Sequence, residues 1–284
     1  FEFVRHDINE PIDLEKLPGL KKFKVEFQGI QQIFNLACPT SPKEYNRIPI
    51  ETLLSNSHGT RNMLEMAVKY KSKFLHISSS SVYGEPLEKA PFQEDYWGFI
   101  NPVGPRSCYN EGKRFAESMV VNYKNAYEIE TKILRVFNTF GPRMRMDDGR
   151  MIPDFVVSAL ENRDIDIYGN ENATSTFCYI NDLIEAIMRT MRAKFSGILN
   201  VGNPQEHKIV DIATEIVKLT KSESKVVYKE ALPFTSKQGV PDITLAKAKL
   251  GWFPVVPLSS GLEETIEHMK GASHLVNFDI NKIK

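Results

Sequence analysis

The run KFLHISSSSVYG, residues 73–84, decides the fold expected for this chain. Its first half is an apolar, strand-like segment, and four serines stand where that strand should end. A helix-like segment, SCYNEGKR at 107–114, follows and carries Tyr109 and Lys113. Hydroxyl groups at the carboxyl end of a parallel strand lie where open α/β sheets bind ligands. Together the two segments predict an α/β protein with a site at one edge of its sheet.

Tyr109 and Lys113 are four residues apart, so on a helix both side chains lie on one face. An ammonium group beside a phenol favours the phenolate, so this spacing predicts a lowered phenol pKa. Such a tyrosine can take a proton from a substrate hydroxyl, and Ser79 could hydrogen-bond the same substrate oxygen. This is the chemistry that a sugar or alcohol dehydrogenase requires. The alternative, from these residues alone, is a polar loop next to an incidental Tyr–Lys pair.

Composition narrows the class of protein. With 284 residues, 42% hydrophobic and 25% charged, we expect a globular chain with one substantial core and a smaller lobe, and we exclude disordered and fibrous classes. Thirty-six basic and 36 acidic residues cancel, so neither nucleic acid nor an anionic membrane is an expected partner. The three cysteines lack the spacing of metal ligands or of a disulfide framework, so we expect no metal and a cytoplasmic location. No apolar stretch is long enough to span a membrane.

The hydrophobic pattern predicts strands that alternate with helices. Strands are expected near 1–5, 32–37, 73–77 and 131–137, and helices near 55–70 and 107–126. This order indicates a parallel sheet with helices on both faces over residues 1–140. Residues 141–284 look like a smaller α+β lobe, with segments near 180–203 returning to the main sheet. In this lobe we expect helices near 152–161, 180–191, 209–219, 245–250 and 262–269, and strands near 165–168 and 198–201.

The sixteen glycines contain no Gly-x-Gly-x-x-Gly pattern. A self-sufficient dinucleotide site normally has one, because only glycine lets the backbone approach a pyrophosphate at a helix start. We therefore expect a strand and a glycine loop to precede Phe1 in the natural protein. If nothing precedes it, cofactor binding becomes doubtful.

Three longer runs carry a family resemblance: NLACPTSP at 35–42, YWGFINPVGPRSCY at 96–109 and FNTFGPRMRMDDGR at 137–150. With these runs the chain resembles the extended short-chain dehydrogenase/reductases, specifically the nucleotide-sugar epimerases, dehydratases and decarboxylases. Among these it is most similar to the UDP-glucuronate decarboxylases. The resemblance extends over about residues 1–269.

The resemblance implies a Rossmann-like domain that binds NAD, a substrate lobe, and a nucleotide-sugar substrate oxidised transiently at C4. Tyr109 would take the C4 hydroxyl proton, Lys113 would hold the nicotinamide ribose, and Ser79 would bind the same hydroxyl, with Ser80 and Ser81 beside it. The C4 ketone would then ease loss of a carboxylate at C5. Relatives also dimerise through the helices near 55–70 and 107–126, which implies a homodimer.

The remaining site residues are transferred position by position, and for each a purely structural role is the alternative. The cofactor contacts implied are Asp7, Ile8, Leu36, Ala37, Ser55, Ser78, Tyr109, Lys113, Thr139 and Arg150. The substrate contacts implied are Asn62, Tyr123 and Asn138.

Three departures bear on the reaction. Decarboxylases and 4,6-dehydratases of the family carry Glu where this chain has Ser81, and a hydroxyl is a poor acid or base without help. Ser175 and Gly239 stand where relatives have phosphate-binding Arg residues, and Lys237 could partly substitute. A decarboxylase is the nearest reading, while a C4 epimerase, a 4,6-dehydratase or a catalytically impaired nucleotide-sugar-binding homologue remain alternatives.

Overall fold

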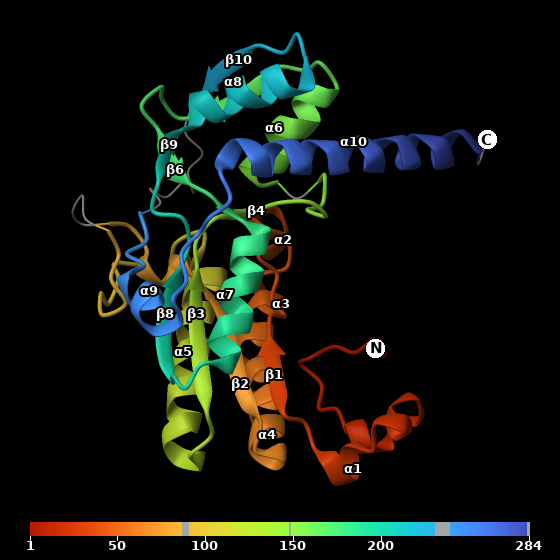
Figure 1. Ribbon diagram of the computed structural model, residues 1–284, viewed down its shortest axis with the longest axis vertical. Helices are drawn as coiled ribbons and strands as arrows, with labels where there is room; N and C mark the ends of the chain where they lie inside the picture. The colour runs from red at the N-terminus through yellow and green to blue at the C-terminus, as the bar shows by residue number, and fades with distance from the viewer. Residues whose placement is uncertain (87–90, 148, 231–238, 283–284) are drawn as a thin grey trace.

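A parallel sheet forms the centre of the larger lobe in this computed structural model (Figure 1). The structure describes residues 1–86, 91–147, 149–230 and 239–282. All neighbouring strands of this sheet run parallel, with Phe34 opposite Leu75 and Leu134 opposite Leu199. Its strands, in spatial order, are β1 (Gln32–Asn35), β2 (Lys73–Ser79), β3 (Thr131–Val136) and β8 (Gly197–Val201).

Helices cover both faces of this sheet, because successive strand residues point to opposite sides. Phe74 packs into one apolar cluster and Leu75 into another. The first cluster is closed by α4 (Thr60–Tyr70) and α5 (Ser107–Tyr127). The second is closed by α7 (Ile180–Arg192) and α9 (Thr244–Leu250). The predicted fold class, a Rossmann-like parallel sheet between helices, is confirmed.

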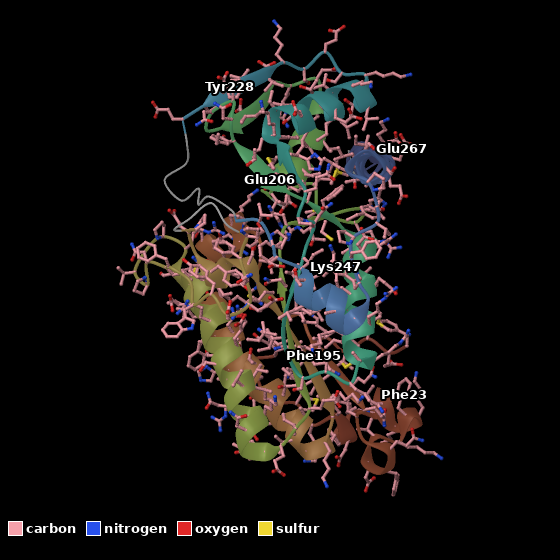
Figure 2. All side chains as sticks on the ribbon, turned by 60° about the vertical axis from the view of Figure 1, so that its left-hand side comes forward. Phe23, Phe195, Glu206, Tyr228, Lys247 and Glu267 are labelled. Carbon is pink, nitrogen blue, oxygen red and sulfur yellow. The ribbon has the colours of Figure 1, made fainter. Side chains whose placement is uncertain are left out.

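Trp252 anchors the end of α9 against the main sheet. Its ring is 2% exposed, packs in the same cluster as Leu134 and Leu199, and donates from Nε1 to the Asp182 carbonyl oxygen at 2.9 Å. The segment 243–252 therefore packs on the larger lobe, whereas the sequence pattern indicated only 180–203 as returning there. Figure 2 shows Lys247 of α9 beside this sheet and Tyr228 at the far end of the other lobe.

The smaller lobe has its own apolar cluster, which includes Phe155, Ile167 and Ile216. Its helices are α6 (Met151–Leu160), α8 (Ile209–Thr220) and α10 (Leu258–Lys282). Its strands form three pairs: β5 (Ile165–Tyr168) with β10 (Val226–Lys229), β4 (Thr139–Phe140) with β7 (Cys178–Tyr179), and β6 (Thr174–Thr176) with β9 (Glu206–Lys208).

The strand expected at residues 1–5 is wrong. Residues 1–5 are exposed and form no strand. Among the described residues, β1 pairs only with β2, so no strand from this segment adds to the edge of the sheet. A strand needs the hydrogen bonds of a neighbour, and an apolar alternation alone does not supply one. Short elements follow: η1 (Leu14–Lys16), η2 (Pro18–Phe23), α1 (Val25–Gln28), α2 (Pro42–Arg47), α3 (Pro49–Leu54), η3 (Ser55–Gly59) and η4 (Ser80–Tyr83).

The helix expected near 55–70 begins earlier and contains a π-helical turn. α3, η3 and α4 follow one another without a break, and η3 is the π-helical part. Such turns insert one extra residue and often occur at functional sites. Across the described part of the chain, no helix combines the length and apolarity needed to cross a membrane.

Candidate active site

The strand ends gather the predicted residues at one edge of the main sheet. β2 ends at Ser79, β1 leads into Leu36 and Ala37, and β3 leads into Asn138 and Thr139. Because the strands run parallel, these carboxyl ends lie together, which is the position where open α/β sheets bind ligands.

Tyr109 lies in the first turn of α5, and its side chain is 6% exposed. Its ring stacks on that of Tyr45 from α2, with centroids 4.9 Å apart and planes 12° apart. Burial raises the pKa of Tyr109 to about 12, while a hydrogen bond with Ser79 and the charge of Arg150 act in the opposite direction. The structure therefore brings Tyr109 and Ser79 together, as predicted.

The predicted lowering of the phenol pKa by Lys113 is wrong for this structure. The Lys113 ammonium group, on a side chain only 3% exposed, donates to the Ile77 carbonyl oxygen at 2.9 Å. Burial lowers the pKa of Lys113 itself. The sequence placed both residues on one helix face correctly, but it could not reveal that desolvation outweighs the charges around the phenol.

This raised pKa predicts a loss of stability at alkaline pH. In the unfolded chain a tyrosine loses its proton near pH 10, so above that pH the folded state retains the Tyr109 proton and is destabilised relative to the unfolded state. Between pH 9 and 11, the wild type should lose about 1.4 kcal/mol more unfolding free energy than Tyr109→Phe. Urea unfolding of both proteins at each pH measures the difference. Equal losses would show that the phenol is not buried as described.

The serine run divides between two environments. Ser78 is buried and donates from its hydroxyl to Glu117 Oε1 at 2.5 Å. Ser79 Oγ accepts from the Ser81 backbone N–H at 3.2 Å, and Ser80 and Ser81 continue into η4. The buried Ser81 Oγ has no hydrogen-bond partner among the described residues. Ser79, Ser80 and Ser81 thus remain candidates for substrate contact, while the Ser78 hydroxyl is engaged inside the protein.

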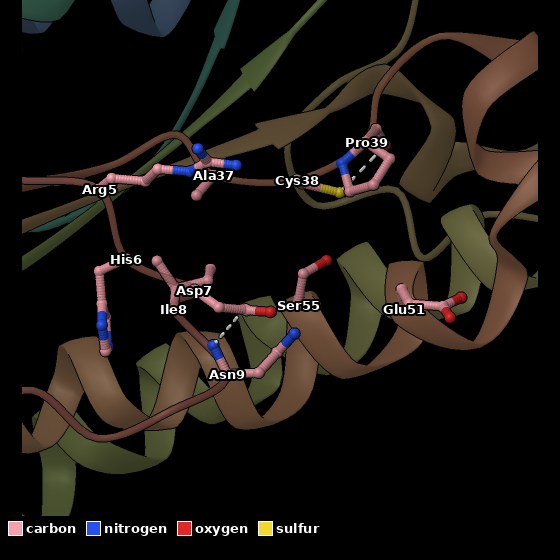
Figure 3. A pocket seen from close by; sticks show the side chains of 10 residues that line it. All are labelled: Arg5, His6, Asp7, Ile8, Asn9, Ala37, Cys38, Pro39, Glu51 and Ser55. Atoms are coloured by element: carbon pink, nitrogen blue, oxygen red, sulfur yellow. Dashed lines mark hydrogen bonds between the residues drawn. The ribbon is translucent and has the colours of Figure 1, made fainter.

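A cavity of about 740 Å³ opens beside the end of β1 (Figure 3). It brings together four of the predicted cofactor residues, Asp7, Ile8, Ala37 and Ser55. Leu36, which precedes Ala37, is exposed. The other lining residues are Arg5, His6, Asn9, Cys38, Pro39 and Glu51.

Asn62 secures one wall of this cavity. Its side-chain amide donates to the Ile8 carbonyl oxygen at 2.8 Å. The Ile8 side chain lies over Gly59, where an added Cβ would stand 2.5 Å from Ile8 Cδ1. Asn62 and Gly59 thus hold the segment around Asp7 against the helix. The structure places Asn62 on the Asp7–Ile8 side and engages its amide there, whereas the resemblance implied a substrate contact.

Tyr123 lies far from Tyr109 on the same helix. It follows Tyr109 by fourteen positions on α5, which at 1.5 Å per residue is about 21 Å along the axis. Its hydroxyl donates to Glu65 Oε1 at 2.5 Å, and its ring contacts Tyr127. The structure therefore does not bring Tyr123 to the site.

Asn138, Thr139 and Arg150 connect the site to the smaller lobe. The Asn138 amide donates to Ser175 Oγ at 2.9 Å, and the Thr139 hydroxyl to the Phe137 carbonyl oxygen at 3.0 Å. Arg150 precedes α6 and donates from Nη2 to Thr40 Oγ1 at 3.2 Å. Arg150 thus reaches the loop after β1, consistent with its electrostatic influence on Tyr109.

Comparison with known proteins identifies the family of this chain. The model of the NAD-dependent epimerase/dehydratase family matches residues 4–202. The chain belongs to this family. A UDP-glucuronic acid decarboxylase 1 of Xenopus tropicalis is 41% identical over 95% of this chain and 61% of its own length. UDP-glucuronic acid decarboxylase 6 of Arabidopsis thaliana is 40% identical over 92% of this chain and 72% of its own length. The resemblance read from the sequence is confirmed.

A solved member of the epimerase/dehydratase family has the same fold. A mutant of UDP-glucuronic acid 4-epimerase from Bacillus cereus, in complex with UDP-4-deoxy-4-fluoro-glucuronic acid and NAD, superposes with a TM-score of 0.81 at 28% identity. The match covers 96% of this chain and 82% of the epimerase. By contrast, the chain spans less than two thirds of the length of the frog decarboxylase.

The residues present fit part of an NAD site of this family. The cavity collects an acidic, an apolar and a hydroxyl side chain, Asp7, Ile8 and Ser55, beside the exposed backbone after β1. Lys113 reaches Ile77 of β2 and Arg150 reaches Thr40 in the loop after β1, and both cations suit a ribose and its phosphates. The sequence supplies no glycine-rich loop for the pyrophosphate. The residues present therefore fit the parts of NAD that lie on either side of the pyrophosphate.

Packing around Gly239 leaves no space for the Arg that relatives have at this position. A Cβ at this position would stand 2.1 Å from the Phe92 ring, so the observed packing leaves no room for a side chain there. Ser175, at the other departure, engages Asn138. Lys237, the expected substitute, lies outside the described residues.

Sequence reasoning missed Tyr45, Glu117 and Arg135. Tyr45 comes from a different helix and reaches Tyr109 only in the folded chain. Glu117, however, follows Tyr109 and Lys113 at the same four-residue interval, so the helical period could have found it. Arg135 carried a second signal, since it is a charged residue between the apolar Leu134 and Val136.

Proposed function

We propose that this chain is an NAD-dependent enzyme that modifies a nucleotide sugar through transient oxidation at C4, most like UDP-glucuronic acid decarboxylase. The observation that carries the proposal is the buried Tyr109 phenol on Ser79, at the edge of a parallel sheet and beside a cavity lined by Asp7, Ala37 and Ser55. The sequence identity of about 40% to decarboxylases over most of the chain supports it.

In this proposal Tyr109 removes the proton of the C4 hydroxyl, and Ser79 orients that hydroxyl by a hydrogen bond. Burial raises the Tyr109 pKa to about 12, so formation of the phenolate depends on the groups that lower this pKa, which are the hydrogen bond with Ser79 and the positive charge of Arg150. Bound NAD would supply the two-electron oxidation of the sugar carbon. Asp7, Ile8, Leu36, Ala37 and Ser55 would hold one side of it, and Lys113, Thr139 and Arg150 the other.

Loss of the C5 carboxylate would follow from the C4 ketone, which stabilises the carbanion left behind. The carboxylate would leave as CO₂ and its bonding electron pair would enter the enolate of the C4 ketone, so this step needs no acid or base at Ser81. C5 would then take a proton from water, and return of the hydride to C4 and of the Tyr109 proton to its oxygen would give the UDP-pentose. A 4,6-elimination does need an acid or base there, and the Ser81 hydroxyl, which is buried and has no hydrogen-bond partner in the described part of the chain, is poorly suited to that role. Ser81 therefore favours a C4 epimerase as the second candidate over a 4,6-dehydratase.

The test is to incubate the protein with NAD and separately with UDP-glucuronate, UDP-glucose and dTDP-glucose, and to identify products by mass and NMR. A UDP-pentose with release of CO₂ from UDP-glucuronate supports the decarboxylase. A product of unchanged mass with inverted C4 supports the epimerase. Absence of turnover with every sugar, while UDP-sugars still bind, would replace both by the impaired homologue.

We further propose a homodimer through α4 and α5. Phe115 of α5 is 53% exposed, while Met63, Met66 and Met119 pack at the cluster on their own sheet, so Phe115 is the side chain best placed for such a contact. Phe115→Lys should convert a dimer into a monomer in light scattering coupled to gel filtration. A monomeric wild type would refute the proposal. The cytoplasmic location and the absence of a nucleic-acid partner stay predictions.

A further inference from the structure

A buried ion pair, Glu117 with Arg135, lies next to the serine run of the candidate site. Glu117 follows Tyr109 and Lys113 on the same face of α5, and Arg135 comes from β3. Arg135 binds the carboxylate with two groups, Nε at 3.0 Å from Oε1 and Nη2 at 2.7 Å from Oε2. Both residues are less than a tenth exposed. Burying two charges costs several kcal/mol, and apolar residues of similar size often give equal stability. Stability alone therefore does not explain the pair.

The first connection from this pair leads to the start of the serine run. Ser78 donates its hydroxyl to Glu117 Oε1 at 2.5 Å, and Ser78 directly precedes Ser79. The carboxylate thus fixes the end of β2 to α5, the same helix that carries Tyr109. A hydrogen bond to an ionised acceptor is shorter and stronger than one between neutral groups.

The second connection leads to the end of the serine run. The Arg135 guanidinium lies over the Tyr83 ring, 4.7 Å from its centroid, and Phe92 stacks on Tyr83 at 4.6 Å. The Tyr83 hydroxyl donates to Asn200 Oδ1 at 2.7 Å. Arg135 also donates from Nη1 to the Glu94 carbonyl oxygen at 2.9 Å. The turn that contains Ser80 and Ser81 is thus held at Tyr83 as well as at Ser78.

We propose that the Glu117–Arg135 ion pair positions Ser79, Ser80 and Ser81 relative to Tyr109. One pair holds both ends of the serine run and binds them to the helix of the tyrosine. Neither residue needs to touch the substrate, so both are positioning residues. The effect on turnover rests on the function proposed above, whereas the effect on the geometry of the serine run does not.

The test replaces both charges together, as Glu117→Leu with Arg135→Met, so that no buried charge is left without its partner. Hydrogen exchange on the protein without ligands should then show the amides of residues 79–84 exchanging at least about tenfold faster, because both fixed ends of the turn are released. With NAD and the sugar that the wild type uses, kcat should fall about 10- to 100-fold and KM change less than about threefold, because displacement of a reacting group by about 1 Å has effects of this size.

A control on the same strand separates positioning from stability. Lys132 is a buried cation on β3 that binds Glu130 and the Met191 and Ala193 carbonyl oxygens at the opposite end of the sheet. Lys132→Met should lower the melting temperature and leave both the exchange of residues 79–84 and kcat unchanged. Should the double variant fail to fold, Ser78→Ala removes one connection only and should accelerate exchange of residues 79–81 with a smaller fall in kcat.

Two results would overturn the proposal. One is a folded variant, double or Ser78→Ala, in which the exchange of the serine run is unchanged. The other is a double variant with faster exchange but wild-type kcat, which would show that the pair orders the turn without serving the reaction. If the wild type turns over no nucleotide sugar, the proposed function fails, and the exchange measurement still decides whether the pair positions the run.

Discussion

Tyr109→Phe is expected to lower kcat for the nucleotide sugar by about 10²- to 10⁴-fold, the range typical for loss of a positioned acid or base. The substitution removes one oxygen from a ring that is buried and stacked on Tyr45, so the packing of α5 should persist. KM for the sugar should change little, because the phenol acts mainly on the reacting proton. Steady-state kinetics on purified protein measure both constants, and a calorimetric titration with NAD checks that the cofactor still binds.

The matched control is Tyr127→Phe, which removes the same oxygen from the last turn of the same helix, where the side chain is half exposed. That variant should keep wild-type kinetics. Full activity of Tyr109→Phe would refute the assignment of this phenol as the base. Loss of activity together with loss of NAD binding would instead point to a structural defect.

Trp252→Ala is expected to lower the free energy of unfolding by about 3–5 kcal/mol, the usual cost of removing a large buried side chain. The indole is nearly inaccessible, packs with α7 against β3 and β8, and donates a hydrogen bond to the Asp182 carbonyl oxygen. Truncation would leave a cavity and an unpaired acceptor under the main sheet. Urea unfolding followed by circular dichroism measures the change.

The chain contains one other tryptophan, Trp97, which is 90% exposed and supplies the control. Trp97→Ala should change the unfolding free energy by less than about 0.5 kcal/mol, as is usual for surface substitutions. Similar losses in the two variants would mean that α9 and Trp252 do not pack on the sheet as described.

Local sequence patterns were sufficient for most of the fold. Apolar runs of strand length predicted β2, β3 and β8, and the strand expected at 165–168 is β5. Long helices such as α5 also began and ended close to their predicted limits. These features depend on side chains near one another in the chain. The segment at 1–5 failed because a strand depends on a partner elsewhere, which no local pattern can reveal.

The site was predictable where a helix or strand fixes the geometry. Tyr109 and Ser79 meet because one begins a helix and the other ends a neighbouring strand. The partner of a flexible side chain was not predictable. Lys113 binds the Ile77 carbonyl oxygen, and Asn62 binds that of Ile8, a residue more than fifty positions away. The predicted direction of the Tyr109 pKa shift was also wrong, because burial of the phenol depends on packing by Tyr45 and other residues distant in the sequence.

The π-helical turn η3 holds one more residue than an α-helical turn would between α3 and α4. Deleting a single residue between 56 and 58 should therefore let the turn close as regular α-helix and leave α3 nearly in phase with α4. Glu51 on α3 would keep its place in the cavity wall, whereas the backbone that follows Ser55 would be rebuilt. In this stretch the number of residues therefore shapes the cavity wall at Ser55 as much as their identity does.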